Sequence, residues 1–100
     1  MRVQLATSLR SRLRGLLGRE SFGGVLVLAP CRDIHTFGMS DAIDFAFVAP
    51  DGTVLAAHRN VPPGKRLRCR SAALVLERFS TDTPWLAKGE TIEIAERRTR

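Results

Sequence analysis

The chain has 100 residues, of which 44% are hydrophobic and 26% are charged, with a formal net charge of +6 at pH 7. These values fit one small globular domain with a modest core, and no apolar run reaches the roughly 20 residues that a membrane-spanning helix needs. The N-terminus lacks the apolar core of a signal peptide, so we expect a cytoplasmic protein. In that compartment Cys31 and Cys69 are expected to be thiols, the alternative being a single disulfide.

The first third of the chain predicts a strand, a helix and a second strand. Residues 2–6 alternate polar and apolar side chains, which is typical of a short strand. Residues 9–17 place leucines at i, i+4, i+7 and i+8, which predicts one apolar helix face. The apolar run 25–29 predicts the next strand, which Pro30 ends.

The middle of the chain predicts a hairpin. Residues 43–49 form its first strand, and the turn Pro50-Asp51-Gly52 leads to a partner strand over 53–58. Because side chains alternate along a strand, Asp44 is expected on a face that is otherwise small and apolar. Its neighbours on that face are Ala46 and Val48, while Ile43, Phe45 and Phe47 share the other face.

The last third predicts shorter elements. Residues 60–65 contain two prolines and a glycine and are expected to form a long loop. A strand is predicted over 72–77, one turn of helix over 84–88, and a last strand over 90–95.

These elements define the expected fold class. Six or seven short strands, one N-terminal helix and a short late helical turn predict a mainly β (α+β) domain. Its architecture is expected to be a compact β-sandwich, jelly-roll-like, or a barrel. The domain covers residues 1–96, with a basic tail at 97–100.

Cys31, His35 and Asp44 place a thiol, an imidazole and a carboxylate within one apolar stretch. Burying an unpaired polar group costs about 1–3 kcal/mol, so each of them needs a partner or a ligand. As nucleophile, base and orienting acid they could form a small hydrolase, and with His58 they could bind zinc. Neither arrangement has a diagnostic spacing, so no metal and no cofactor is predicted. The structural alternative has His35 bonded to a backbone carbonyl or to Asp44, and Asp44 held at a low pKa by backbone N–H groups at a bend.

A binding function is favoured over catalysis. The 35–39 segment and the basic 59–70 stretch are expected to edge a groove for a small acidic ligand or a protein partner. The candidate binding residues are His35, Phe37, Met39, Asp44, Arg59 and Arg66. The structural alternative places Phe37 and Met39 in the core and treats the basic stretch as solvated charge.

Nucleic acid is a further candidate partner. Residues 1–19 carry five cations and no acidic residue, and the same is true of residues 59–70. Such cations can neutralise phosphates. These stretches lack interleaved aromatic residues and any known reader motif, so nucleic-acid binding would rest on charge alone.

The chain resembles the family known as domain of unknown function 192, because five short landmark motifs occur in the order typical of that family. The Cys31 and His-Thr-Phe-x-Met pattern is similar to that of its leaderless members. Two positions depart from the family pattern: Ala42 replaces the usual proline, and Ser80-Thr81-Asp82 replaces a Pro-Ala-Gly turn. The resemblance implies a small, mostly β fold of jelly-roll or barrel type and no established activity. The landmarks are Arg14-Gly15-Leu16, His35-Thr36-Phe37-Gly38-Met39, Ala42-Ile43-Asp44, Asp51-Gly52 and Val75-Leu76-Glu77.

Overall fold

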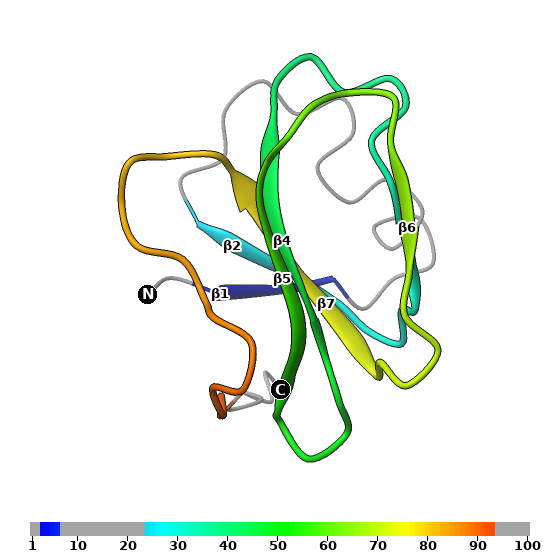
Figure 1. Cartoon of the computed structure of the whole chain (residues 1–100), viewed down its shortest axis with the longest axis vertical. Coiled ribbons are helices and arrows are strands. Elements are labelled where there is room, and N and C mark those ends of the chain that lie inside the picture. Colours follow the sequence, from blue (N-terminus) through cyan, green and yellow to red (C-terminus); the bar gives the residue numbers. More distant parts are fainter. Residues whose placement is uncertain (1–2, 7–23, 94–100) are drawn as a thin grey trace, which may run out of the picture.

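Seven strands form two sheets in the computed structural model, which describes residues 3–6 and 24–93. A five-stranded sheet has the order β1-β2-β7-β4-β5, and β3 pairs with β6 in a separate two-stranded sheet. Figure 1 shows the two-stranded sheet on one side of the larger sheet and the segment after β7 on the other. The strands are β1 (Val3–Ala6), β2 (Val25–Leu28), β3 (Asp33–His35), β4 (Ile43–Val48), β5 (Val54–Val61), β6 (Arg66–Arg68) and β7 (Leu74–Phe79).

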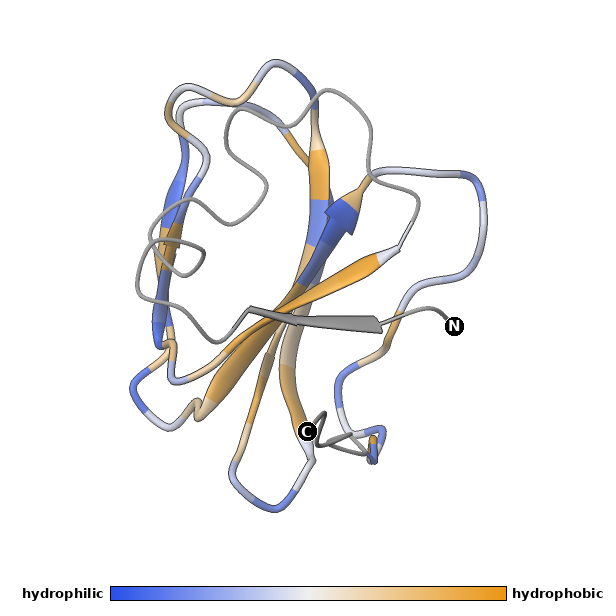
Figure 2. Cartoon of the chain, turned by 180° about the vertical axis from the view of Figure 1, so that it is seen from behind, coloured by the Kyte–Doolittle hydropathy of each residue, from blue (hydrophilic) through white to orange (hydrophobic). Residues whose placement is uncertain are grey.

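The large sheet is covered on both faces, which explains why β2 and β4 are buried along their whole length. We call the layer between the two sheets the inner core; it contains Phe45, Phe47, Ile34 and Met39. On the other face, Val48 and Leu76 pack with residues of the C-terminal segment 80–92, and we call this layer the C-terminal core. Figure 2 shows the hydrophobic strands of the large sheet beside the more hydrophilic β3–β6 sheet.

The strand predictions for the first and middle parts of the chain are confirmed. The 2–6 and 25–29 patterns correspond to β1 and β2, which pair in parallel. In β4 the expected division of faces holds, since Phe45 lies in the inner core and Ala46 in the C-terminal core. The partner strand β5 is longer than predicted and runs to Val61.

The prediction of a loop over 60–65 is wrong at its first two residues. The register between β4 and β5 shifts between Ile43 and Phe45, so one extra residue of β5 lies opposite Asp44. Asn60 takes up this bulge with a positive φ of 53°, a conformation that asparagine adopts more readily than most residues. The strand therefore continues through the irregularity to the first proline.

Two late elements also differ from prediction. The turn of helix expected over 84–88 is absent: the segment runs irregularly, because Trp85 and Leu86 pack into the C-terminal core. The strand expected over 90–95 is reduced, within the residues described, to a single bridge between Thr53 and Thr91.

The remaining fold expectations have mixed outcomes. The prediction of a barrel as one possible architecture is wrong, since the five-stranded sheet is open and ends at β1 and β5. The helix predicted over 9–17 and the tail at 97–100 lie outside the described residues. Within residues 3–6 and 24–93 no helix is long and apolar enough to cross a membrane.

The turn between β4 and β5 depends on Gly52, and this gives a testable prediction. Gly52 has a φ of +92°, and an added Cβ would collide with the backbone oxygen of Ile92. Gly64 has a similar φ of +87° but open space around it, so it is a matched control. Gly64→Ala is expected to cost roughly 1–2 kcal/mol through backbone strain alone. Gly52→Ala is expected to cost roughly 1–3 kcal/mol more, measured by urea unfolding, because the C-terminal segment must shift. Equal losses for the two variants would contradict this packing.

Candidate functional site

The exposed face of the β3–β6 sheet is the strongest candidate for a functional surface, and we call it the basic face. In this antiparallel pair Ile34 lies opposite Leu67, and both side chains pack toward the inner core. Because side chains alternate along a strand, the flanking residues point to solvent. These are Asp33, His35, Arg66 and Arg68.

Asp33 links the two arginines of the basic face. Its Oδ2 lies 2.7 Å from Arg66 Nη2 and 3.4 Å from Arg68 Nη2. The hydrogen bond from Arg66 is the main reason that the pKa of Asp33 lies below its usual value. Exposed ion pairs contribute about 0–1 kcal/mol to stability, so this contact mainly orients the guanidinium groups.

An aromatic pair lies beside these arginines. The rings of His35 and Phe37 stack with centroids 5.6 Å apart and planes 28° from parallel. Phe37 is 53% exposed, and among residues 24–93 it is the large hydrophobic side chain that stands out to solvent. The structural alternative, which places Phe37 in the core, is therefore wrong. His35 is also exposed and lies directly opposite Arg66, so the pair and the arginines share one surface.

Thr36 fixes the loop that carries this pair. Its N–H donates to the carbonyl of Lys65 (2.7 Å), and its hydroxyl donates to the carbonyl of Pro62 (2.7 Å). The hydroxyl also accepts from the N–H of Lys65 (2.8 Å). Since Thr36 is buried, these bonds are shielded from water and hold the two loops together.

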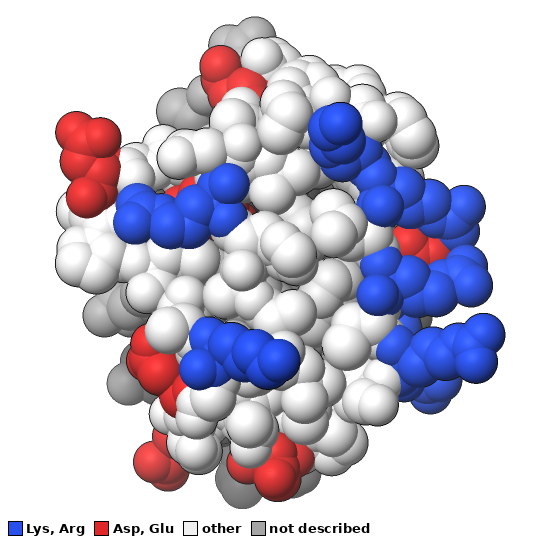
Figure 3. All heavy atoms as spheres, in the orientation of Figure 1, with Lys and Arg blue, Asp and Glu red and all other residues white. Residues whose placement is uncertain are grey.

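Positive charge is concentrated around the basic face. Figure 3 shows Lys and Arg side chains gathered along the edge of the molecule that carries β6, with acidic atoms between them. The exposed cations of this region outnumber the carboxylate of Asp33 five to one. They are Arg32, Lys65, Arg66, Arg68 and Arg70.

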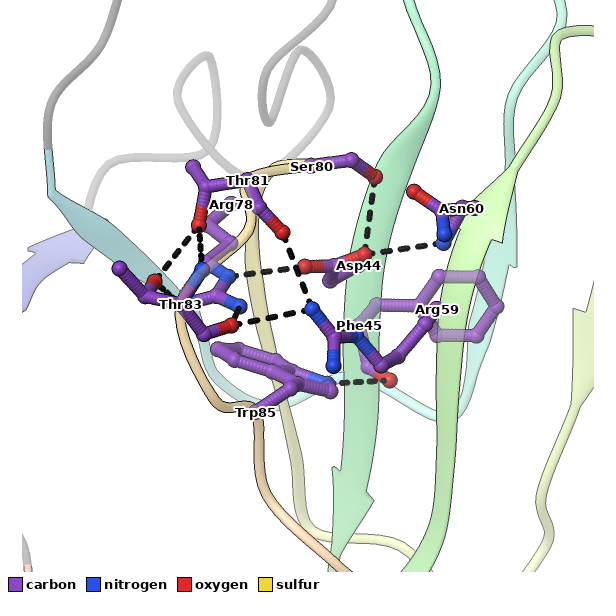
Figure 4. Close-up of polar contacts among 9 residues, drawn as sticks. All are labelled: Asp44, Phe45, Arg59, Asn60, Arg78, Ser80, Thr81, Thr83 and Trp85. Atoms are coloured by element: carbon purple, nitrogen blue, oxygen red, sulfur yellow. Dashed lines mark hydrogen bonds and ion pairs between the residues drawn. The ribbon is translucent and has the colours of Figure 1, made fainter.

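Asp44 lies on the opposite side of the large sheet in a buried polar network (Figure 4). Its Oδ1 accepts hydrogen bonds from the N–H of Asn60 (2.9 Å) and the hydroxyl of Ser80 (2.8 Å). Its Oδ2 accepts from Arg78 Nε at 2.9 Å. Burial alone would raise the pKa of Asp44, but these bonds, led by that of Asn60, hold the pKa below its usual value. The expectation that backbone N–H groups at a bend bind this carboxylate is confirmed for one group, that of Asn60, while the other two donors are side chains.

The same network fastens the C-terminal segment to the sheet. Arg78 donates to the hydroxyl (3.0 Å) and carbonyl (2.8 Å) of Thr83, and lies 4.6 Å from the ring centre of Trp85. The indole N–H of Trp85 donates to the carbonyl of Phe45 at 3.2 Å. Arg59 adds two bonds of 3.0 Å, to the carbonyls of Thr81 and Thr83. Asp44 and Arg59 are thus structural partners in this network rather than parts of the basic face.

The proposed catalytic trio does not come together. Asp44 faces the C-terminal segment, whereas His35 lies on the basic face, beyond the inner core. Cys31 packs against the inner core, and its thiol donates to the carbonyl of Asp33 at 3.2 Å. Burial raises the pKa of the Cys31 thiol, and the carboxylates of Glu77 and Asp33 raise it further. A raised pKa disfavours the thiolate that nucleophilic catalysis needs.

The zinc alternative meets the same difficulty. His58 packs against the ring of Phe45 with centroids 5.0 Å apart, on the large sheet and away from His35. In the part of the chain that the structure describes, no three His, Cys, Asp or Glu side chains are grouped so that they could hold a metal ion. Cys31 and Cys69 are both free thiols.

Of the six predicted binding residues, three share one surface: His35, Phe37 and Arg66. Met39 is buried in the inner core, as its structural alternative expected. Asp33 and Arg68 complete the basic face and were not among the predicted binding residues. The alternation Arg66-Leu67-Arg68 carries the period of a strand and could have indicated them, but the loop assigned just before it obscured the pattern.

Glu77 is a second buried carboxylate. It is 3% exposed and lies on β7 between Leu26 and Phe45. Since both of these neighbours belong to the inner core, Glu77 faces the β3–β6 side of the large sheet. It belongs to the late landmark of the family resemblance.

Comparison with known proteins identifies the class to which this open, two-sheet β domain belongs. The model of the DUF192 family, described as "Uncharacterized ACR", matches residues 1–95, so the chain belongs to that family. A search of curated proteins finds no match.

Two solved structures share the fold. One is a protein of unknown function from Novosphingobium aromaticivorans, with a TM-score of 0.68 and 21% identity, over 78% of this chain and 62% of that one. The other, from Sinorhizobium meliloti, is described as "a putative transcription regulator"; it has a TM-score of 0.67 and 24% identity, over 78% of this chain and 67% of that one. The chain thus spans about two thirds of the length of either protein, and the likeness concerns the fold.

Proposed function

We propose that this protein is a binding module that takes an acidic ligand or partner on the basic face. The observation that carries the proposal is the position of Phe37, which is exposed on a loop held in place by buried Thr36 and stacks on His35, the residue opposite Arg66. Aromatic and arginine side chains are the types enriched in protein interaction surfaces, and here they occur together on one face. The excess of cations favours a partner with negative charge.

A hydrolase built on Cys31, His35 and Asp44 is less well supported. The described geometry separates Asp44 from His35, and burial raises the pKa of the Cys31 thiol. The binding proposal needs none of these groups to react. It also fits a cytoplasmic protein, which is the location we propose.

The test is an amide NMR titration of the ¹⁵N-labelled full chain. Citrate serves as a small polycarboxylate, a short polyglutamate peptide as an acidic partner, and spermine at matched ionic strength as the oppositely charged control. We expect either acidic probe to shift the signals of His35, Phe37 and Arg66, and Arg66→Gln to weaken that response. Lys88→Gln, in the turn before Gly89, is the control and is expected to leave it unchanged. Shifts equal for spermine and the acidic probes, or none on β3 and β6, would contradict the proposal.

A further inference from the structure

The basic face combines two kinds of contact that a purely acidic partner cannot use together. The faces of aromatic rings carry negative electrostatic potential, so a carboxylate is disfavoured over the exposed ring of Phe37. The arginines that share this face with its stacking partner His35 nonetheless attract anions. A partner that fits both features carries flat, uncharged rings together with separate negative groups.

Single-stranded nucleic acid has this chemistry. Its bases stack on aromatic side chains while its phosphates contact Lys and Arg along the same path. In the sequence the basic stretches lack interleaved aromatics, but the fold supplies them: His35 lies directly opposite Arg66, and Phe37 stacks on His35. A double helix offers no free base faces for such a platform.

Asp33 indicates which nucleic acid fits better. It is the acidic group of the basic face, and its carboxylate repels phosphates. A carboxylate is also an acceptor with about four lone-pair sites, of which Arg66 and Arg68 occupy some. The ribose 2′-hydroxyl, which DNA lacks, can donate a hydrogen bond to such an acceptor.

We propose that the partner of the basic face is single-stranded RNA, with bases stacked on the Phe37–His35 pair and phosphates contacted by Lys65, Arg66 and Arg68. This inference rests on the proposed function, because it names the partner of the same surface. The RNA inference goes beyond the proposed function because it requires both π-stacking and a ribose contact.

The experiment measures fluorescence anisotropy of labelled oligonucleotides with the full chain. The labelled probes are oligouridylate, the matching oligodeoxyuridylate and duplex RNA, each at several salt concentrations; binding of unlabelled polyphosphate and polyglutamate is measured by the amide NMR titration described above. We expect oligouridylate to bind most tightly. Phe37→Leu keeps the apolar bulk but removes the ring, and is expected to weaken that binding roughly 5- to 140-fold, the equivalent of about 1–3 kcal/mol for one stacked base.

Charge variants separate stacking from electrostatics. Lys65→Gln is expected to lower the slope of log affinity against log salt by about 0.7, the value for one phosphate contact to a single strand, and Lys88→Gln is expected to leave it unchanged. Binding of polyphosphate as tight as that of oligouridylate, and insensitive to Phe37→Leu, would overturn the RNA inference while supporting an anion-binding face. Equal affinity for the DNA oligomer would overturn the choice of RNA. Tight binding of polyglutamate alone would assign an acidic protein instead, and no binding of any anion would overturn both proposals.

Discussion

Asp44→Ala is expected to lower the free energy of unfolding by about 3–5 kcal/mol, because it leaves the Arg78 guanidinium buried without its charge partner. It also removes the acceptor for the N–H of Asn60 and the hydroxyl of Ser80. The measurement is urea unfolding followed by the fluorescence of Trp85, the chain's single tryptophan, which lies in the same network. If Asp44→Ala does not fold, Asp44→Asn gives the same comparison with a smaller perturbation.

Asp33→Ala is the matched control, since it breaks an ion pair of similar length at the surface. Its expected cost is no more than about 1 kcal/mol. Similar losses for the two variants would show that the buried network contributes no more than an exposed pair. A small loss for Asp44→Ala would mean that Arg78 regains water when its partner is removed.

The contribution of Asp44 should depend on pH in one direction. Because the folded-state pKa lies below the unfolded value of about 3.9, the stabilisation is fully present above that value and is lost as pH falls through the folded pKa. The difference in stability between the original protein and Asp44→Ala is therefore expected to be constant near neutral pH and to shrink under acid conditions. Urea midpoints measured across acidic and neutral pH test this, and a difference that grows on acidification would have the wrong sign.

Phe47→Ala is the second large expected effect, again about 3–5 kcal/mol, because Phe47 is 1% exposed in the inner core and its loss leaves a cavity. Phe37→Ala removes the same atoms from a side chain that is 53% exposed, and is expected to change stability by no more than about 0.5 kcal/mol. Thermal and urea unfolding of both variants measure the contrast. A large loss for Phe37→Ala would place it back in the core and weaken the case for the basic face.

The fold could be predicted from the sequence wherever one pattern decided the structure. The alternation of residues 43–48 set both faces of β4, and the polar position in it correctly identified Asp44 as a group needing several donors. The bulge that supplies the N–H of Asn60 could not be predicted, since it depends on the pairing of β4 with β5. Nor could the position of Arg78, the residue that fastens the C-terminal segment, because Arg78 meets Asp44 only when β7 lies beside β4.

The site was harder to predict than the fold. Hydrophobicity alone placed Phe37 in the core, whereas alternation counted from Ile34 puts Thr36 inside and Phe37 outside, as the structure has them. Two short strands far apart in sequence bring His35 opposite Arg66, and β6 begins directly after a segment rich in prolines. Tertiary pairing, which no local pattern encodes, therefore assembles the basic face from pieces that are individually weak signals.

The hydrogen bonds between β5 and the C-terminal segment also have a consequence for association between molecules. β5 is the last strand of its sheet, and such an edge can recruit strands from other chains. At one end, Glu90 and Gly89 occupy the backbone groups of Val54, and at the other the bulge at Asn60 twists the strand beside the charged Arg59. Both ends of this edge are thereby protected against strand addition, so the sheet can expose β5 without becoming a template for aggregation.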